Sequence, residues 1–439
     1  MDKIINVVSL DWRKFGDYSA VGQLTQKIFS IDPEVTVFPV QCIDGLFCNV
    51  FTVTDDGKLQ NVFETKVKHD AVQNYIRKLD VSAFYVRLSP HIGVLELACK
   101  IAAVQSNVPL IVHYMDKPSF SGMSPSRVAY IKEMYRFLTL RADSVYTIHA
   151  SSLTWLHDTY DCKASVLANF IKTVPELKFD LRELQERPIH ISYFGSVDSK
   201  MNDSALFFFC RLISNCSWIK LSIWTNSHIS NVHDLSVISN ASCNIDIFKS
   251  NLDEASFKLK LEESDLLLIA YNQDAEVYLK HSFSNKYVDY LEVGGVILCL
   301  GPIGIPTVKS CREIGVSLVF ENEAEMVSAF ESKEVFLNLL SELDLEQYVD
   351  RLQELQTAQL NLTSSFFEDI KRLSTARLLT DRPGQNSEQW TGNAIQMQQL
   401  AFLIRRKFYD LARGQQSLSA TLMAETIRAK GYKGFDYEI

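Results

Sequence analysis

The sequence predicts an α/β protein with two doubly wound, Rossmann-like domains and a helical C-terminal region. Short runs of branched apolar residues, typical of buried parallel strands, alternate with segments of helical periodicity through most of the 439 residues. This alternation occurs in two series, and a polar stretch at residues 173–188 separates them as a candidate hinge. From residue 324 the helical pattern takes over. A chain of this length is expected to form two or three domains with sizeable cores.

Residues 1–175 are interpreted as the first domain, because candidate strands alternate with candidate helices along them. The strands are expected at residues 4–10, 35–39, 83–88, 110–113 and 144–148. The helices are expected at residues 20–30, 71–79, 94–106, 125–141 and 152–160. Parallel strands joined by crossing helices place the ligand crevice beyond the carboxyl ends of the strands.

Residues 189–335 are interpreted as a second domain of the same kind. Its strands are expected at residues 190–194, 220–224, 244–248, 266–270, 296–300 and 317–320. Residues 336–439 are expected to form a helical region. A Pro-Gly-Gln-Asn break at residues 383–386 divides this region from a terminal segment at 390–414.

The composition excludes several classes of protein. A formal net charge of −9 argues against a general nucleic-acid binder, which needs a basic surface. The nine cysteines lie in apolar surroundings without the spacing of common metal sites, as expected of buried free thiols in a reducing compartment. No apolar run is long enough to span a membrane, and the amino terminus lacks the apolar core of a signal peptide. The predicted location is therefore the cytoplasm.

The most informative stretch, residues 264–302, predicts a strand, a loop, a short helix and a second strand. The helix begins at Ser284, Asn285 and Lys286, where free backbone N–H groups favour a phosphate. Asp289 follows one turn later, so Asn285, Lys286 and Asp289 share one helix face. In a nucleotide site, the cation would lie beside the diphosphate and the carboxylate would accept hydrogen bonds from the ribose hydroxyls.

This helix resembles the donor-binding helix of retaining glycosyltransferases of the GT-B fold, in particular the family 4-like group. The family pattern is a small residue, a lysine and then an acidic residue five positions before a glycine, as Asp289 stands before Gly294. Two positions depart from it. The family's other acidic residue, eight positions earlier, falls on His281. The proline that usually follows the glycine is replaced, the local sequence being Gly294-Gly295-Val296. The resemblance covers about residues 1–375, although only short motifs within it are specific.

The resemblance implies that the second domain binds a nucleotide-diphosphate sugar and that the first domain binds the acceptor, in two domains facing a cleft. In that family a glycine after the first strand of the second domain lets the donor diphosphate approach, and a basic residue neutralises it. Gly195, Ser196 and Lys200 lie at this point, where an ordinary strand-to-helix turn is an equally good interpretation. The chain has no Asp-x-Asp element, which metal-dependent transferases use to hold the diphosphate, so neither a metal nor another cofactor is expected.

Three residues of the first domain are further candidates. The resemblance assigns Asp116 to contact with the acceptor or the transferred sugar. His113 is a second catalytic candidate beside it, although a lone histidine at a strand end is more often structural. Gly16 follows the first strand, where family members have a glycine-rich loop against the donor phosphate; alone it is more typical of a turn.

His281 is the catalytic candidate of the second domain. It would hydrogen-bond hydroxyls of the transferred sugar where relatives carry glutamate, and its ionisation would make activity depend on pH near neutrality. Alternatively, Glu276 or Asp274 supplies the carboxylate from the preceding loop.

Residues 400–409 place apolar side chains at helical spacing beside three cations. Such a segment could bind an anionic membrane surface and bring the enzyme to a lipid-linked acceptor at the inner face of the membrane. The alternative is a helix that packs back across the two domains with its cations solvated.

The predicted function is a hexosyltransferase-like glycosyltransferase of polysaccharide or glycoconjugate synthesis, with a saccharide, lipid-linked or protein acceptor. Two alternatives stay open. One is a nucleotide-sugar epimerase of the same fold. The other is a non-catalytic partner derived from a transferase, which the missing second carboxylate favours. The sequence does not identify the base, the sugar, the acceptor, the linkage or the oligomeric state.

Overall fold

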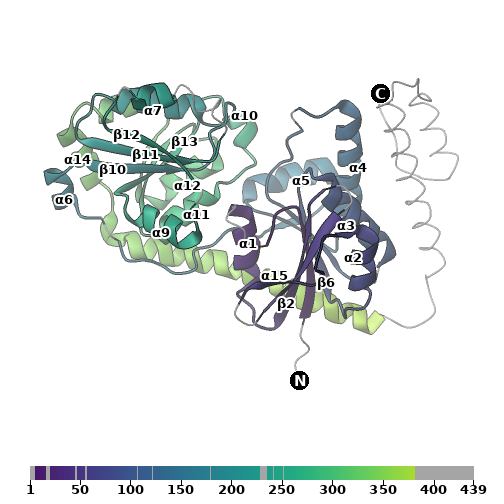
Figure 1. Cartoon of the computed structure of the whole chain (residues 1–439). Helices are drawn as coiled ribbons and strands as arrows, with labels where there is room; N and C mark the ends of the chain where they lie inside the picture. The colour runs from purple at the N-terminus through teal and green to yellow at the C-terminus, as the bar shows by residue number, and fades with distance from the viewer. Residues whose placement is uncertain are drawn as a thin grey trace.

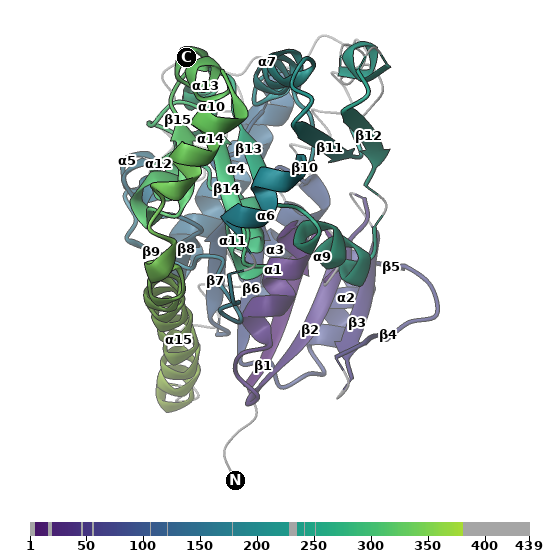
Figure 2. The same cartoon turned by 90° about the vertical axis from the view of Figure 1, so that its left-hand side faces the viewer.

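The computed structural model describes residues 5–380 except 16–19, 45–46, 55–56, 106, 121, 178, 228–234, 241 and 251. Its strands form two sheets, each at the centre of one α/β body, and a long C-terminal helix reaches both bodies (Figures 1 and 2). The predicted fold class is therefore confirmed.

The first sheet has nine strands among the described residues, in the order β4-β3-β2-β1-β6-β7-β8-β9, with β5 paired to β3. Neighbours are parallel from β2 to β9 along this order. The strands are β1 (Ile5–Asp11), β2 (Val35–Cys42), β3 (Phe47–Val53), β4 (Leu59–Asn61), β5 (Val67–Lys68), β6 (Ala83–Leu88), β7 (Leu110–Tyr114), β8 (Ser144–Thr147) and β9 (Ala164–Val166). The connecting α-helices are α1 (Ala20–Phe29), α2 (His69–Ile76), α3 (Ile92–Val104), α4 (Pro125–Arg141) and α5 (Leu153–Tyr160).

The second sheet is parallel throughout, in the order β12-β11-β10-β13-β14-β15. Its strands are β10 (Ile189–Phe194), β11 (Ile219–Thr225), β12 (Ile245–Lys249), β13 (Leu266–Ala270), β14 (Val296–Leu300) and β15 (Ser317–Phe320). Its helices are α6 (Leu181–Glu186), α7 (Asp203–Ile213), α9 (Glu254–Glu262), α10 (Glu276–Leu279), α11 (Asn285–Glu292), α12 (Pro306–Ile314), α13 (Glu323–Ala329) and α14 (Lys333–Ser341). The chain reverses its direction of winding between β10 and β13, and ligands of such sheets bind at this switch point.

Both sheets are buried on their two faces. Their strands are therefore continuous runs of apolar residues in the sequence. In β13, Leu266 and Leu268 belong to the core on the α7 side, whereas Leu267 and Ile269 pack with α11 and α12 on the other side. Successive side chains of a strand point to opposite faces, so each core takes every second residue.

Strands β3, β4 and β5 were not predicted. β3 pairs antiparallel with β2, and β4 and β5 each pair antiparallel with β3. β4 and β5 have three and two residues, too few for an alternating pattern to stand out. Gly57 lies in the turn between β3 and β4 with a φ of +78°, a left-handed conformation that glycine adopts without steric cost.

Helix α15 (Tyr348–Thr380) links the two bodies and runs beneath both sheets in Figure 1. Near its start, Tyr348 and Leu352 pack into the core of the second sheet. Further along, Phe366, Phe367 and Ile370 complete the core between α1 and the first sheet. The helix therefore contributes to a core in each body.

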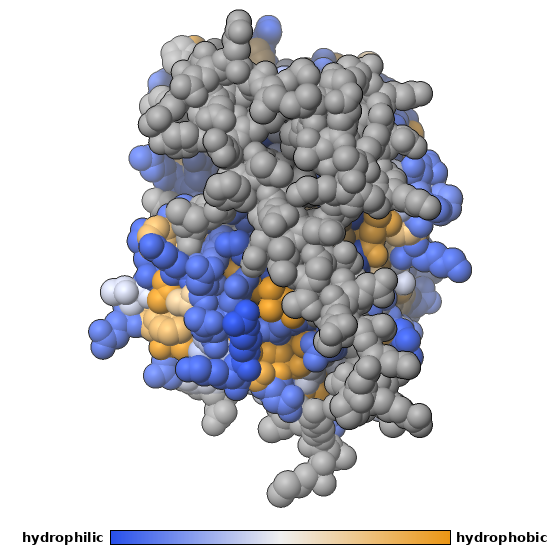
Figure 3. All heavy atoms as spheres, turned by 90° about the vertical axis from the view of Figure 1, so that its right-hand side faces the viewer, coloured by the Kyte–Doolittle hydropathy of each residue, from blue (hydrophilic) through white to orange (hydrophobic). Residues whose placement is uncertain are grey.

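Among the described helices, none combines the length and the apolar composition that a membrane-spanning segment requires. Figure 3 shows one side of the molecule, where the described hydrophobic residues gather in separate patches among hydrophilic ones. The segment expected to bind a membrane surface, residues 400–409, lies outside the described residues.

Candidate functional site

The candidate site begins at the switch point of the second sheet, where Gly195 directly follows the end of β10. The φ of Gly195 is +138°, and its backbone N–H donates to the carbonyl of Trp224 at 2.9 Å. The side chain of Lys286, from the first turn of α11, crosses directly over Gly195, so a Cβ at this position would collide with it. Two motifs separated by most of the second domain are thus brought into contact, as a shared phosphate site requires.

A hydrogen-bonded group around Tyr193 holds Lys286 in place. The ammonium of Lys286 donates to the Tyr193 hydroxyl at 3.0 Å and lies 4.2 Å from the centre of the ring. The hydroxyl donates in turn to the carbonyl of Ser196 at 2.6 Å and accepts from the amide of the buried Asn202 at 2.6 Å. Burial lowers the pKa of Lys286 to about 8, although nearby Asp289 opposes this shift. Lys286 is therefore a cation with little protein counter-charge.

Asp289 lies one turn further along α11 and faces the first body. Burial raises the pKa of its carboxyl group to about 7, against the attraction of Lys27 from α1. Lys27 itself forms a 2.8 Å ion pair with Glu292, and Glu292 also accepts from the backbone N–H of Lys172 at 2.7 Å. α11 is thus fixed against the first body through charged contacts.

The first residues of α11 are also positioned by neighbours. The backbone N–H of Ser284 donates to the hydroxyl of the buried Thr307 at 2.9 Å. The side-chain carbonyl of Asn285 accepts from the amide of Asn169, also buried, at 3.2 Å. The start of the helix therefore has a defined place at the junction of the two bodies.

The loop before α11 docks on the first body. His281 Nδ1 lies 2.8 Å from the carbonyl of Ser151, and the hydroxyl of Ser152 donates to the carbonyl of His281 at 2.8 Å. Asp116, on the loop after β7, accepts a hydrogen bond from Ser282. Desolvation of the carboxyl group by neighbouring protein atoms raises the pKa of Asp116, although the residue as a whole is solvent-exposed. Asp116 and the loop of His281 therefore meet across the junction.

Other predicted site residues lie elsewhere. His113 is fully buried within β7, 2.6 Å from the Tyr85 hydroxyl, and burial together with Arg87 lowers its pKa to about 3. A catalytic role for His113 does not fit this position, because a substrate cannot reach a ring inside the sheet; the structural role fits. Lys200 is exposed on the loop after β10, with its ammonium 5.5 Å from the ring centre of Tyr278. Gly16 lies outside the described residues.

Tyr193 and Lys27 contribute to the site but were not predicted from the sequence. The sequence pattern indicates a core residue of an apolar strand at Tyr193. At Lys27 it indicates a solvated cation in the last turn of α1. A tyrosine two residues before the glycine that follows the strand was the available signal for Tyr193. For Lys27 there was none, because its partners come from the other body.

No protein-family model and no curated protein sequence matches this chain. Solved structures share its fold at low sequence identity. Sucrose-phosphate synthase from Thermosynechococcus elongatus has a TM-score of 0.60 and 10% identity, over 85% of this chain and 100% of that chain. OtsA has a TM-score of 0.53 and 10% identity, over 84% of this chain and 99% of that chain. TarM has a TM-score of 0.50 and 10% identity, over 73% of this chain and 63% of the longer TarM chain.

These similar structures are glycosyltransferases of the GT-B fold. The chain therefore has the GT-B fold, with two doubly wound domains. The expectation that came from the helix of Lys286 is confirmed at the level of the fold.

Proposed function

We propose that this protein is a glycosyltransferase that moves a sugar from a nucleotide-diphosphate sugar to an acceptor hydroxyl. The donor binds at the switch point of the second sheet, and the acceptor binds against the first domain. The GT-B fold supports this proposal at the level of the reaction class. The contacts between β10 and α11 support the position of the donor.

The observation that carries the proposal is the contact between Gly195 and Lys286. A glycine with a left-handed φ leaves the space above the end of β10 to a lysine that is largely desolvated. A desolvated cation that a nearby carboxylate stabilises only in part costs free energy in the ligand-free protein. A bound diphosphate would supply that counter-charge through charge-assisted hydrogen bonds.

The leaving diphosphate would then be stabilised without a metal ion. Lys286, the exposed Lys200 and the free N–H groups at the start of α11 would meet its charge. Asp289, one turn further on, would accept from the ribose hydroxyls. Metal independence is in this way a property of the proposed donor site.

The sugar would lie between the loop of His281 and Asp116. Since Nδ1 of His281 is directed at the Ser151 carbonyl, its Nε2 is the atom left for a sugar hydroxyl. A hexosyl unit and retention of the anomeric configuration are proposed on the resemblance of α11 to the retaining group, and no protein nucleophile is assigned. The acceptor is proposed to be a saccharide, a lipid-linked saccharide or a protein hydroxyl.

Thermal denaturation with UDP, GDP, ADP, CDP and dTDP tests the donor site. At least one nucleoside diphosphate should raise the melting temperature, because a ligand that binds only the folded state stabilises it. Lys286→Ala should weaken that binding by about 1.5–3 kcal/mol, the contribution of a charged hydrogen bond. Lys280→Ala, an exposed lysine on the same segment, is the matched control and should bind normally.

Asp289→Ala separates the two halves of the ligand. This variant should lose affinity for the nucleoside diphosphate while keeping its affinity for pyrophosphate, which has no ribose. If no nucleoside diphosphate at millimolar concentration shifts the melting temperature, the donor site is wrongly placed. Equal affinity in both variants and the wild type would leave α11 with a structural role alone.

A further inference from the structure

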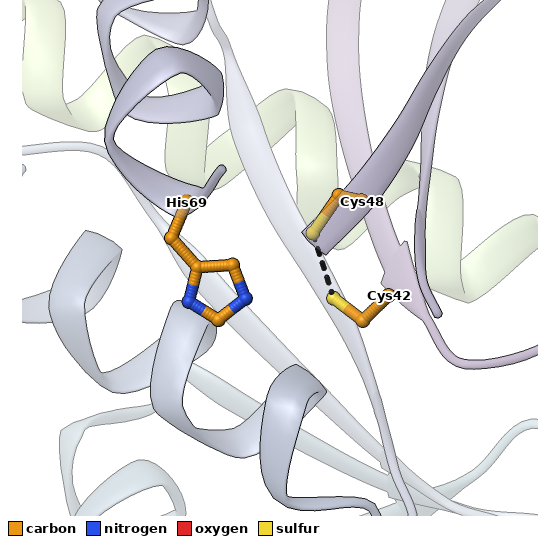
Figure 4. Close-up of side chains that lie close together, drawn as sticks. All are labelled: Cys42, Cys48 and His69. Carbon is orange, nitrogen blue, oxygen red and sulfur yellow. Dashed lines mark hydrogen bonds between the residues drawn. The ribbon is translucent and has the colours of Figure 1, made fainter. Parts of the chain in front are cut away.

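Two cysteines of the first domain face each other across the antiparallel strands β2 and β3. Cys42 and Cys48 are cross-strand partners. In the neighbouring pair, the backbone N–H of Ile43 donates to the carbonyl of Phe47 at 2.9 Å. Cys42 and Cys48 therefore form a non-hydrogen-bonded pair, in which opposing side chains approach most closely. Their sulfur atoms are 3.4 Å apart (Figure 4).

A histidine completes the cluster. His69 is the first residue of α2, and Figure 4 shows its ring directed towards the two sulfur atoms. One ligand atom from each of the three residues lies within 4.8 Å of the other two. Both cysteines have no exposed surface, and His69 is 2% exposed. Three residues distant in the sequence thus present two sulfurs and one ring nitrogen to a single buried point.

The ring of His69 has no hydrogen bond of normal geometry among the described residues, although the Cys48 thiol interacts with it. Both Nδ1 and Nε2 of His69 are buried and unpaired. Burial of a polar group without a full hydrogen bond is unfavourable, and such groups in native structures usually have a partner or an ion. The ring therefore lacks a partner that a bound ion would provide.

We propose that Cys42, Cys48 and His69 bind a thiophilic metal ion, with Zn²⁺ as the best match. Zinc in proteins takes tetrahedral sulfur and nitrogen ligands, with bonds of about 2.3 Å to sulfur and about 2.0 Å to nitrogen. A tetrahedron with these bonds places the two sulfurs about 3.8 Å apart and each sulfur about 3.5 Å from the nitrogen. The observed separations reach this geometry by side-chain shifts of about 1 Å or less at each ligand, well within rotamer adjustment.

The charges of the site also suit this ion. Two thiolates would neutralise the charge of Zn²⁺ and so lower the free-energy cost of burying the ion.

A disulfide between Cys42 and Cys48 would account for the two sulfurs but would not account for the buried ring of His69 beside them. The metal accounts for all three residues, which is why it is preferred. Its place at the carboxyl end of β2 ties the hairpin of β2 and β3 to α2, so the proposed ion is structural. This proposal does not rest on the proposed transferase activity.

The test is metal binding by the full-length protein under a non-chelating reductant. After incubation with Zn²⁺ and removal of the excess, mass spectrometry of the metal should find about one ion per chain, as for other structural sites. Loading with Co²⁺ instead should produce thiolate-to-cobalt charge-transfer absorption together with the visible bands of tetrahedral cobalt. Cys48→Ser and His69→Gln should each reduce the bound zinc by about tenfold or more.

Cys99→Ser and His157→Gln are the matched controls, because they remove the same groups elsewhere in the first domain. Both should bind zinc as the wild type does. Circular dichroism and thermal denaturation of each variant report whether it has folded. The cobalt spectrum of the wild type tests the ligands without any substitution.

Three results would overturn the proposal. The reduced wild type could bind no more zinc than Cys48→Ser does. The cobalt spectrum could lack thiolate bands. Finally, a disulfide could be found instead. The wild type isolated without reductant would then have two fewer titratable thiols than its nine cysteines, and Cys42→Ser would have all of its remaining thiols. The wild type would also bind no zinc after reduction.

Discussion

Raising the pH from about 7.5 to about 9 should weaken the binding of a nucleoside diphosphate, because Lys286 loses its proton over this range. Burial holds the pKa of Lys286 at about 8 in the ligand-free protein, below its ordinary value of 10.5. A bound diphosphate favours the charged amine and raises this pKa again. Binding is then strongest below the pKa of the free protein and declines as the pH rises above it.

The size of the effect follows from the fraction of protonated lysine. With a pKa of about 8, roughly three quarters of Lys286 carries a proton at pH 7.5 and roughly one tenth at pH 9. The affinity should therefore fall about eightfold between these values. Asp289, with a pKa of about 7, is already largely ionised at the lower pH and adds little to the change. The unliganded protein responds in the opposite sense, since the lowered pKa of Lys286 makes folding more favourable as the pH rises from about 8.

Calorimetry at the two pH values, in buffers of different ionisation enthalpy, measures both the affinity and the proton taken up. Lys286→Met should bind weakly at both values with no slope and no proton uptake. Lys286→Arg should show a much flatter profile than the wild type, because a guanidinium stays charged in this range. An unchanged wild-type affinity across the range, or a slope that persists in Lys286→Met, would refute the assignment of Lys286 to the diphosphate.

Three further results are expected. Gly195→Ala should lose diphosphate binding and about 1–3 kcal/mol of stability, because the methyl group strains the backbone and displaces the side chain of Lys286. Gly57→Ala is the control, because Gly57 also has a left-handed φ but open surroundings. It should keep diphosphate binding in the same titration. Transfer activity should survive EDTA without rescue by Mg²⁺ or Mn²⁺; rescue by either ion would disprove a metal-free donor site, whereas rescue by Zn²⁺ alone would point to the cysteine cluster. Phe366→Ala should cost about 3–5 kcal/mol in chemical denaturation, and the half-exposed Leu362→Ala about 0.5 kcal/mol or less; equal losses would mean that α15 does not complete the core.

The sequence predicted the buried strands better than the rest of the fold. The strands at residues 83–88, 266–270, 296–300 and 317–320 have the predicted bounds, because a strand buried on both faces is a short apolar run between polar residues. Strands β3 to β5 were not predicted, because the pairing of β3 depends on the neighbouring strand β2 rather than on the residues of β3 to β5 alone. α15 was expected to be helical, but its packing on both cores could not be read from one amphipathic pattern.

The candidate site divides in a similar way. Gly195 and Lys286 were predicted because each follows a strand in a recognisable local pattern. Their contact with each other, and the part that Tyr193 plays, depend on strand order and loop path, which local patterns do not specify. The cysteine cluster was missed for the same reason: the spacing from Cys42 to Cys48 is set by a hairpin, and His69 arrives from the next helix.

The position of α15 has a consequence for synthesis of the chain on the ribosome. One face of the first sheet, lined by Val7, Val37 and Tyr85, is covered by α1 and by Phe366 near the end of the described chain. At about 5–20 residues per second, the roughly 200 residues between β9 and Phe366 take about 10–40 s to be made. During that interval the first domain exists with an incomplete core and an open apolar face. A chaperone that shields nascent chains would have its longest opportunity here, and truncation before α15 should yield an aggregating fragment rather than an isolated acceptor domain.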